Sequence, residues 1–239
     1  NRAYHLPVLL KESVDGMSIK PEGTYVDVTF GGGGHSAEIL SRLGEKGRLF
    51  AFDQDQDAQE NSIDDPRFTL IPANFRFIKR FLRLEGVNEV DGILGDFGVS
   101  SHQFDKGERG FSIRFEAELD MRMDQNTGLG ASELLNTYSQ EQLAQLIWQY
   151  GEIKMSRKLA KAIVERRIIE PIKSTKDLND LLTPFFPPTK VNKFLAQVYQ
   201  AIRIEVNQEM EALKEFLIQT SELITKGGKL SLISYHSLE

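Results

Sequence analysis

The first hundred residues alternate short apolar runs with stretches of helical periodicity. Runs rich in β-branched and aromatic residues predict four strands, at 24–30, 48–52, 68–71 and 90–99. Apolar residues at helical spacing predict helices between them, one from about Ser36 and one across 75–84. Strands joined by short helical connections form βαβ units around a parallel sheet. The predicted fold class is therefore α/β.

The pattern changes after an irregular polar stretch at 104–123. Only helical patterns follow, at 131–135, 140–150, 156–167, 175–182 and onward from about Lys193. A fifth strand is expected at 229–235, after a helix whose apolar residues at 206, 210, 213 and 217 lead back to the sheet. We therefore expect a doubly wound, mostly parallel sheet interrupted by a helical insertion. The expected division is 1–125 and 201–239 for the sheet domain and 126–200 for the insertion.

A glycine-rich turn follows the first predicted strand, where residues 27–35 read DVTFGGGGH. Glycines let a backbone approach a ligand closely, and the free N–H groups of the next helix attract anionic or polar groups. Asp53 lies twenty residues after Gly33, at the end of the second strand, where doubly wound folds place an acceptor for ribose hydroxyls. The pattern favours an adenosine-containing cofactor; the alternative is a flexible connection and a solvated aspartate.

The spacing narrows the choice of cofactor. Ser36 stands at the third glycine position of a dinucleotide fingerprint, and the chain has no G-K-[ST] of a P-loop. The turn is closer to the acidic-x-G-x-G-x-G motif of S-adenosylmethionine-dependent methyltransferases. Asp27 takes the acidic place, Gly31 and Gly33 the later glycines, and Thr29 replaces the first.

Two further strand ends carry polar residues. Ligands of open α/β sheets bind beyond the carboxyl ends of the strands, so the loop after Asp96 borders the same crevice. Asp96 can accept a hydrogen bond from a cofactor or substrate amine, while Ser100 equally suits a turn or helix cap. His236 follows the last strand and is a candidate base, although a lone histidine is more often structural.

Nine segments spread from one end of the chain to the other resemble a single family. They are HLPVLL (5–10), DVTFGGGGHS (27–36), DFGVSS (96–101), RGFS (109–112), DMRM (120–123), YGE (150–152), AIVER (162–166), QAIRIEVN (200–207) and GGKLSLISYHSLE (227–239). Together they resemble the RsmH (MraW) cytosine-N4 methyltransferases of small-subunit ribosomal RNA. The resemblance implies a class I, Rossmann-like methyltransferase fold with an inserted helical domain.

The resemblance also implies S-adenosylmethionine as methyl donor. The cofactor contacts that it carries over are Gly33, Gly34, His35, Asp53, Phe75, Asp96 and Gln103. Phe75 is expected beside the adenine, although Ile78 and Leu82 share its helix face and core packing is an equal alternative. An oxygen acceptor near the cytosine amine, supplied by Asp96, Ser100 or a backbone carbonyl, is expected to localise the amine's delocalised lone pair. His236 completes the catalytic candidates.

The implied reaction is methylation of the exocyclic N4 of a cytidine in the decoding region of small-subunit (16S) ribosomal RNA. The absence of cysteine excludes the covalent cysteine route of cytosine C5 methylation and thiolate metal sites. The expected setting is cytoplasmic, without membrane or metal, on ribosomal RNA or an assembling small subunit. The alternatives are a cofactor-binding RNA-binding module without catalysis and a Rossmann-type NAD oxidoreductase. The family continues past SYHSLE, so C-terminal sheet elements are expected to be missing.

The net charge of −6 argues against a nucleic-acid partner until its distribution is considered. Residues 154–193 hold ten Lys/Arg against four Asp/Glu, or +6, which leaves −12 for the remainder. The candidate RNA-binding residues in the predicted helix there are Arg157, Lys158, Lys161, Arg166 and Arg167. A second basic stripe is expected at Arg76, Lys79, Arg80 and Arg83. Either stripe is also compatible with an ordinary solvated helix face.

Overall fold

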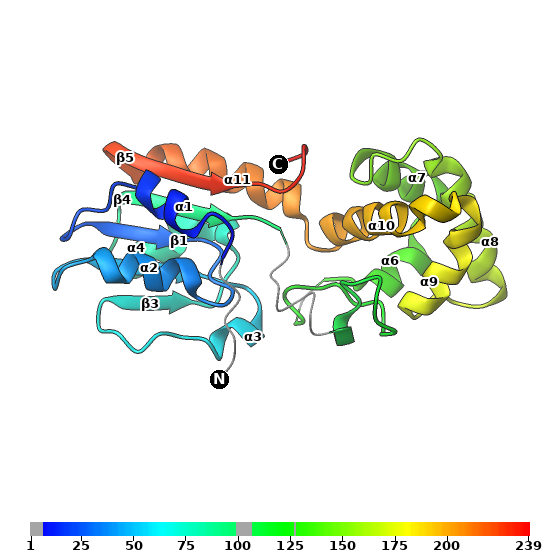
Figure 1. Ribbon diagram of the computed structural model, residues 1–239, viewed down its shortest axis with the longest axis horizontal. Coiled ribbons are helices and arrows are strands. Elements are labelled where there is room, and N and C mark those ends of the chain that lie inside the picture. The colour runs from blue at the N-terminus through cyan, green and yellow to red at the C-terminus, as the bar shows by residue number, and fades with distance from the viewer. Residues whose placement is uncertain (1–6, 99–106, 127) are drawn as a thin grey trace. The chain divides into compact units, whose positions relative to one another are not determined.

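The computed structural model describes residues 7–98, 107–126 and 128–239. They fall into two compact units, one formed by the chain up to residue 100 together with Met210–Glu239, and the other by Ser101–Glu209 (Figure 1). The division at 100/101 and 209/210 differs from the expected boundaries at 125/126 and 200/201. Within the described ranges, no helix is both long and apolar enough to cross a membrane.

The first unit is built on a five-stranded parallel sheet. Its strands are β1 (Thr24–Asp27), β2 (Arg48–Phe52), β3 (Phe68–Ile71), β4 (Val90–Asp96) and β5 (Ile224–Ile233). Their order is β3-β2-β1-β4-β5, and every neighbouring pair is parallel. The α/β prediction is confirmed. Strand β5 begins five residues earlier than expected because Gly227, with a φ of 85°, lies within the strand where its register against β4 shifts.

Helices cover both faces of the sheet. The helices of this unit are α1 (Leu10–Gly16), α2 (Gly34–Arg42), α3 (Gln56–Gln59), α4 (Ile78–Leu84, after the 3₁₀ turn Phe75–Phe77) and α11 (Glu209–Leu223). Side chains alternate along a strand, so Val26 packs with α4 and α11 while its neighbour Tyr25 packs with α1 and α2. The three layers match a doubly wound fold.

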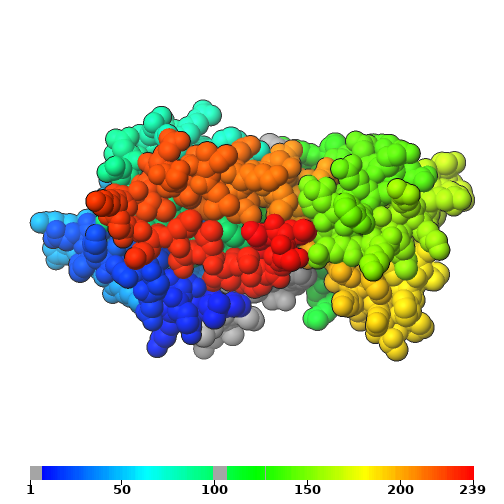
Figure 2. Space-filling model, turned by 90° about the horizontal axis from the view of Figure 1, so that it is seen from above, coloured from blue at the N-terminus to red at the C-terminus, as the bar shows by residue number. Residues whose placement is uncertain are grey.

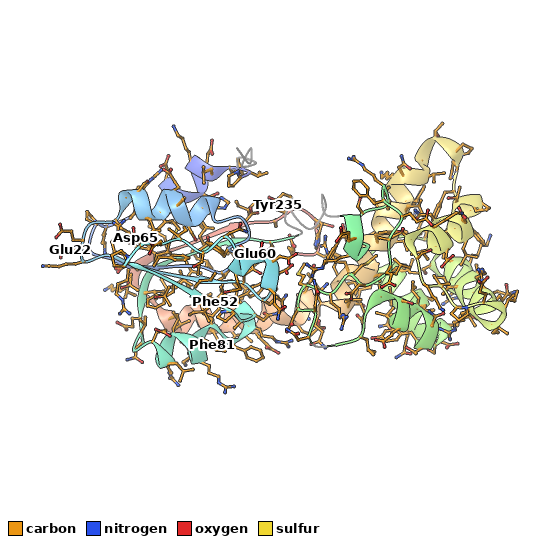
Figure 3. The ribbon with its side chains drawn as sticks, turned by 90° about the horizontal axis from the view of Figure 1, so that it is seen from below. Glu22, Phe52, Glu60, Asp65, Phe81 and Tyr235 are labelled. Atoms are coloured by element: carbon orange, nitrogen blue, oxygen red, sulfur yellow. The ribbon has the colours of Figure 1, made fainter. Side chains whose placement is uncertain are left out.

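Segments from the two ends of the chain lie side by side in this unit. The Ser231 hydroxyl of β5 donates to the Ser13 carbonyl of α1 at 3.0 Å, and Figure 2 shows the blue α1 region beside the red β5 region. Figure 3 shows Glu22 and Asp65 at the opposite end of the sheet from Tyr235, which follows β5. The carboxyl ends of the strands thus gather at one edge.

Ion pairs with α11 occupy two cations of the expected second basic stripe. The Arg76 guanidinium donates to both carboxylate oxygens of Glu215, at 2.8 and 2.7 Å, and Lys79 pairs with Glu222. The stripe is therefore partly neutralised inside this unit, and these two residues fasten the start of the α4 segment to α11. The sequence interpretation considered one helix face without the acidic face that packs on it, while Arg80 and Arg83 remain exposed.

The second unit contains the five expected helical segments. They are α6 (Ala131–Thr137), α7 (Gln140–Gln149), α8 (Ser156–Ile169), α9 (Thr175–Leu182) and α10 (Val191–Val206). Capping boxes begin two of them, since Ser139 caps α7 and Ser174 caps α9. The long stretch expected from Lys193 is broken at Asn207 and Gln208, which separate α10 from α11.

The motif residues at 109–123 pack in this helical unit rather than in the sheet unit. The Asn207 side chain accepts from the Met123 N–H at 2.8 Å and donates to the Met121 carbonyl at 2.8 Å. The Leu119 N–H donates to the Lys173 carbonyl at 2.9 Å. These contacts tie the segment to the residues just before α9 and just after α10, so it lies in the second unit and not, as expected, in the first.

Candidate functional site

The glycine turn starts where β1 ends, at the carboxyl edge of the sheet. Gly31 and Gly33 have φ values of 51° and 78°, a left-handed conformation that side chains disfavour. The Gly33 N–H closes the turn on the Phe30 carbonyl at 2.8 Å. The turn therefore needs these two glycines whether or not a ligand is bound.

Helix α2 begins directly after this turn with an uncapped N-terminus. Gly33 is its N-cap and no side chain caps it, although the first N–H groups of a helix lack acceptors within it. Gly34 has a different role, since a Cβ there would lie 2.4 Å from the ring of Pro7. The helix start therefore offers backbone donors to a ligand, while Gly34 also makes room for the N-terminal segment.

Asp53, at the end of β2, faces the turn. Its carboxylate accepts from the Gly31 N–H and from the Asp55 N–H, each at 2.8 Å. Burial raises the pKa of Asp53 to about 6, and the two backbone donors oppose that rise only in part. A carboxylate has about four acceptor positions, so Asp53 retains acceptor capacity, and its contact with ribose hydroxyls stays a prediction.

A buried network joins the ends of β1 and β4. Asp27 is fully buried and accepts from the Ser36 hydroxyl at 2.6 Å and the Thr29 N–H at 3.1 Å. The Thr29 hydroxyl in turn accepts from the Asp96 N–H at 2.7 Å. Thr29 and Ser36 depart from glycine motifs in the sequence, and the structure shows that both hold the turn to the sheet through hydrogen bonds.

His35 and Asp96 lie close together beside the turn. The His35 Nδ1 lies 3.9 Å from the Asp96 Oδ2, and the imidazole is buried. His35 Nε2 and Asp96 Oδ1 are buried without a hydrogen-bond partner among the described residues. Burial raises the pKa of Asp96. Unsatisfied buried polar atoms are rare in folded proteins, so the pair points to a polar ligand at this place.

Tyr235 is a site residue that the sequence interpretation missed. Its hydroxyl is hydrogen-bonded to the Asp96 carboxylate, and its ring lies beside Gly98, where a Cβ would be 3.2 Å from it. Its signal was its position directly beyond the carboxyl end of a strand. The neighbouring His236 instead pairs with Glu239, with 3.1 Å between His236 Nε2 and Glu239 Oε1.

Phe75 takes part in the core. Its ring centroid lies 5.6 Å from that of Phe97 and 5.3 Å from that of Phe216, and the ring remains half-buried. The packing alternative thus describes its present contacts, and its place beside an adenine stays a prediction. Two other candidates, Ser100 and Gln103, lie outside the described residues.

The candidate RNA-binding residues all lie on α8 but differ in their surroundings. Arg157, Lys158 and Lys161 are exposed. Arg166 binds the Glu170 carboxylate at 2.9 Å, and Arg167 donates to the carbonyls that end α6, Leu135 and Tyr138, at 2.8 and 2.7 Å.

Arg167 therefore stabilises the fold by capping a helix C-terminus. The exposed charge is concentrated in the first half of α8, which narrows the basic surface to Arg157, Lys158 and Lys161.

These features fit S-adenosylmethionine, whose ribose, amino-acid and adenine groups need the donors and acceptors described here. Asp53 offers an acceptor for hydroxyls, the start of α2 offers N–H donors, and His35 and Asp96 offer unsatisfied polar atoms. A glycine turn and a strand-end acid placed this way suit a bound nucleoside.

The chain is similar to known proteins along nearly its whole length. Residues 2–239 match the model of the MraW methylase family. Proteins named ribosomal RNA small subunit methyltransferase H are similar over 99% of this chain: that of Christiangramia forsetii is 64% identical and that of Flavobacterium johnsoniae 61%, and the chain covers 78% of each. That of Cytophaga hutchinsonii is 57% identical, with 80% of it covered. With a class I sheet, a glycine turn at the end of β1 and a match along nearly its whole length, the chain belongs to the MraW methylase family.

Proposed function

We propose that this protein transfers a methyl group from S-adenosylmethionine to the exocyclic N4 of a cytidine in small-subunit ribosomal RNA. The names of its relatives support the RNA class, and the family supports the reaction type. The observation that carries the proposal is Asp96, a carboxylate with a buried, unpartnered Oδ1 among the described residues, beside the glycine turn.

Methylation of a cytosine amine requires a hydrogen-bond acceptor close to that amine. The lone pair of an exocyclic cytosine amine is delocalised into the ring, so the amine is a weak nucleophile. An oxygen that accepts a hydrogen bond from the amine localises the lone pair on the nitrogen, where it can attack the methyl group that the cofactor supplies. Asp96 is the proposed acceptor, and the remaining contribution of the protein is orientation of the two reactants.

The proposed cofactor contacts in the described chain are Gly33, Gly34, His35, Asp53, Phe75 and Asp96. His236 is not favoured as a base because both ring nitrogens are engaged: Nδ1 accepts from the Leu238 N–H at 3.3 Å and Nε2 lies 3.1 Å from Glu239 Oε1. A positively charged sulfur leaving group requires no general acid. Cytidine in structured RNA must leave its stack to reach a site at a sheet edge. We therefore propose that the substrate presents the base in a loop or flips it out.

The test is transfer of labelled methyl groups to small-subunit particles and to their naked RNA, followed by nucleoside analysis. We expect N4-methylcytidine in one of the two. Cofactor binding without transfer to either substrate would favour a binding module instead. Binding of a nicotinamide dinucleotide in place of S-adenosylmethionine would point to an oxidoreductase.

The exposed basic residues of α8 are proposed to bind the RNA backbone. Reversal of two of them, Arg157→Glu with Lys161→Glu, is expected to weaken RNA binding at least tenfold, since each lost phosphate contact lowers affinity and salt dependence. Cofactor affinity is expected to stay unchanged. The measurements are RNA binding at two salt concentrations and calorimetry with S-adenosylmethionine.

A matched double reversal controls for net charge. Lys20→Glu with Lys46→Glu alters two exposed lysines near the amino ends of the strands, whose side chains are 68% and 79% exposed. This control should leave RNA binding nearly intact. Equal weakening by both pairs, or equal loss of cofactor and RNA binding by the α8 pair, would contradict a basic surface on α8.

A further inference from the structure

Tyr235 is the residue at the sheet edge whose contacts no cofactor role explains. It follows β5, lies at the carboxyl end of the sheet (Figure 3) and keeps 54% of its surface exposed. Its hydroxyl nevertheless bonds to the half-buried Asp96 carboxylate. An exposed ring whose hydroxyl contacts a half-buried acid connects the surface of the site to the proposed acceptor.

The Tyr235 hydroxyl bonds to the Asp96 carboxylate, which has few other contacts that fix its orientation. On the β1 side, Thr29 binds the Asp96 main chain and not its side chain. On the α2 side, the His35 Nδ1 is 3.9 Å away, beyond hydrogen-bond distance. Among the described residues, Tyr235 thus supplies the hydrogen bond that fixes the orientation of the Asp96 carboxylate.

Gly98 makes this arrangement possible. It has a φ of 114°, and an added Cβ would lie 3.2 Å from the Tyr235 ring. The backbone after β4 therefore passes directly beside the aromatic ring. One side of the ring is occupied by Gly98, and the exposed remainder is free to contact an unstacked base, for which aromatic side chains are suited.

We propose that Tyr235 is a positioning residue for methyl transfer, which orients Asp96 through its hydroxyl and contacts the acceptor base through its ring. The inference rests on the proposed function. It assigns separate tasks to two parts of one side chain, since the hydroxyl acts on the rate of transfer and the ring acts on the binding of RNA.

Removal of the hydroxyl separates these tasks. Tyr235→Phe is expected to lower kcat by roughly 10- to 100-fold, the value of one hydrogen bond to a charged group. The KM for RNA and the affinity for S-adenosylmethionine should change less than twofold, because the ring remains. Tyr235→Leu, which removes the ring as well, should also raise the KM for RNA.

The pH profile provides a readout that loss of packing alone would not move. Burial raises the pKa of Asp96, while the Tyr235 hydroxyl and the neighbouring His35 lower it. The buried Asp27 on β1 also faces this cluster, since it interacts electrostatically with both His35 and Asp96. Without the hydroxyl, Asp96 holds its proton more firmly, so the acidic limb of kcat for Tyr235→Phe should move to higher pH.

Tyr138 offers a matched control, because its hydroxyl binds the Glu205 carboxylate at 3.0 Å in the helical unit. Tyr138→Phe removes the same kind of hydrogen bond and should change neither kcat nor the pH profile. An unchanged kcat and pH profile in Tyr235→Phe, with an active wild type, would overturn this inference alone. A wild type that transfers no methyl group to small-subunit RNA would overturn the proposed function and the inference together.

Discussion

Replacement of Asp53 by asparagine is expected to weaken S-adenosylmethionine binding by roughly 10- to 100-fold at pH 7.5. The variant loses the charge that strengthens hydrogen bonds from ribose hydroxyls, and each such bond contributes about 1.5–3 kcal/mol. Gly31 and Asp55 each direct an N–H at one oxygen of the present carboxylate. In the variant, the asparagine NH2 group replaces one of these oxygens, so two hydrogen-bond donors face each other. Calorimetric titration with the cofactor measures the change.

Asp64→Asn is the matched control, since Asp64 is an exposed aspartate in the connection between β2 and β3. It should bind the cofactor as the wild type does. Equal affinity of Asp53→Asn and wild type would remove Asp53 from the cofactor site and leave it a purely structural acceptor for the glycine turn.

The raised pKa of Asp53 predicts how pH affects cofactor binding. The pKa of Asp53 is raised to about 6 by burial, and hydroxyl donors favour the ionised carboxylate. Below pH 6 the wild type must lose a proton before it binds the cofactor through this group, so its affinity should fall by up to tenfold per pH unit. The ratio of wild-type to Asp53→Asn affinity should therefore shrink between pH 7 and pH 5.

The stability of the ligand-free protein should change with pH in the direction opposite to that of the cofactor affinity. Between the unfolded pKa near 3.9 and the folded value of about 6, the folded state holds more protons at Asp53 than the unfolded state. Lowering the pH through this window therefore stabilises the wild type relative to Asp53→Asn. An ionised carboxylate that destabilises the fold at neutral pH but favours ligand binding is typical of functional sites.

The predictable parts of the fold are those with local or periodic signals. Strand β2 needs no tertiary information, since RLFAF carries its own β propensity, and the capping boxes at Ser139 and Ser174 mark the starts of α7 and α9. The glycine turn and Asp53 were predictable for a similar reason, because their spacing along the chain reflects the geometry of one βαβ unit.

The parts that were missed depend on partners distant in sequence. The acceptors of Arg167 lie about thirty residues away, on the end of α6, and the acids paired with Arg76 and Lys79 lie on α11. Tyr235 meets Asp96 only because β5 joins the sheet beside β4. Pairings of this kind follow from topology, so a pattern on a single element cannot reveal them.

The largest expected loss of stability follows Gly110→Ala, in the segment that sequence analysis placed with the sheet. Gly110 has a φ of 75°, and a Cβ there would lie 2.4 Å from the Glu118 carbonyl oxygen and 3.1 Å from the Leu119 Cα. Both obstacles are backbone atoms, so no side chain can turn aside to relieve the overlap. Strain from the left-handed conformation and from overpacking adds up to about 2–4 kcal/mol.

The loss of stability should be confined to the helical unit, and the chain contains a natural fluorescent probe of the folding of that unit. Trp148 is the single tryptophan and lies in α7, so its fluorescence during urea unfolding follows this unit. Gly128→Ala is the matched control: Gly128 has a φ of 78° in the same unit but no heavy atom within 4 Å of an added Cβ. It should cost about 1 kcal/mol from conformational strain alone. Equal losses for the two variants would show that backbone conformation, and not the close approach of Glu118, makes glycine necessary at position 110.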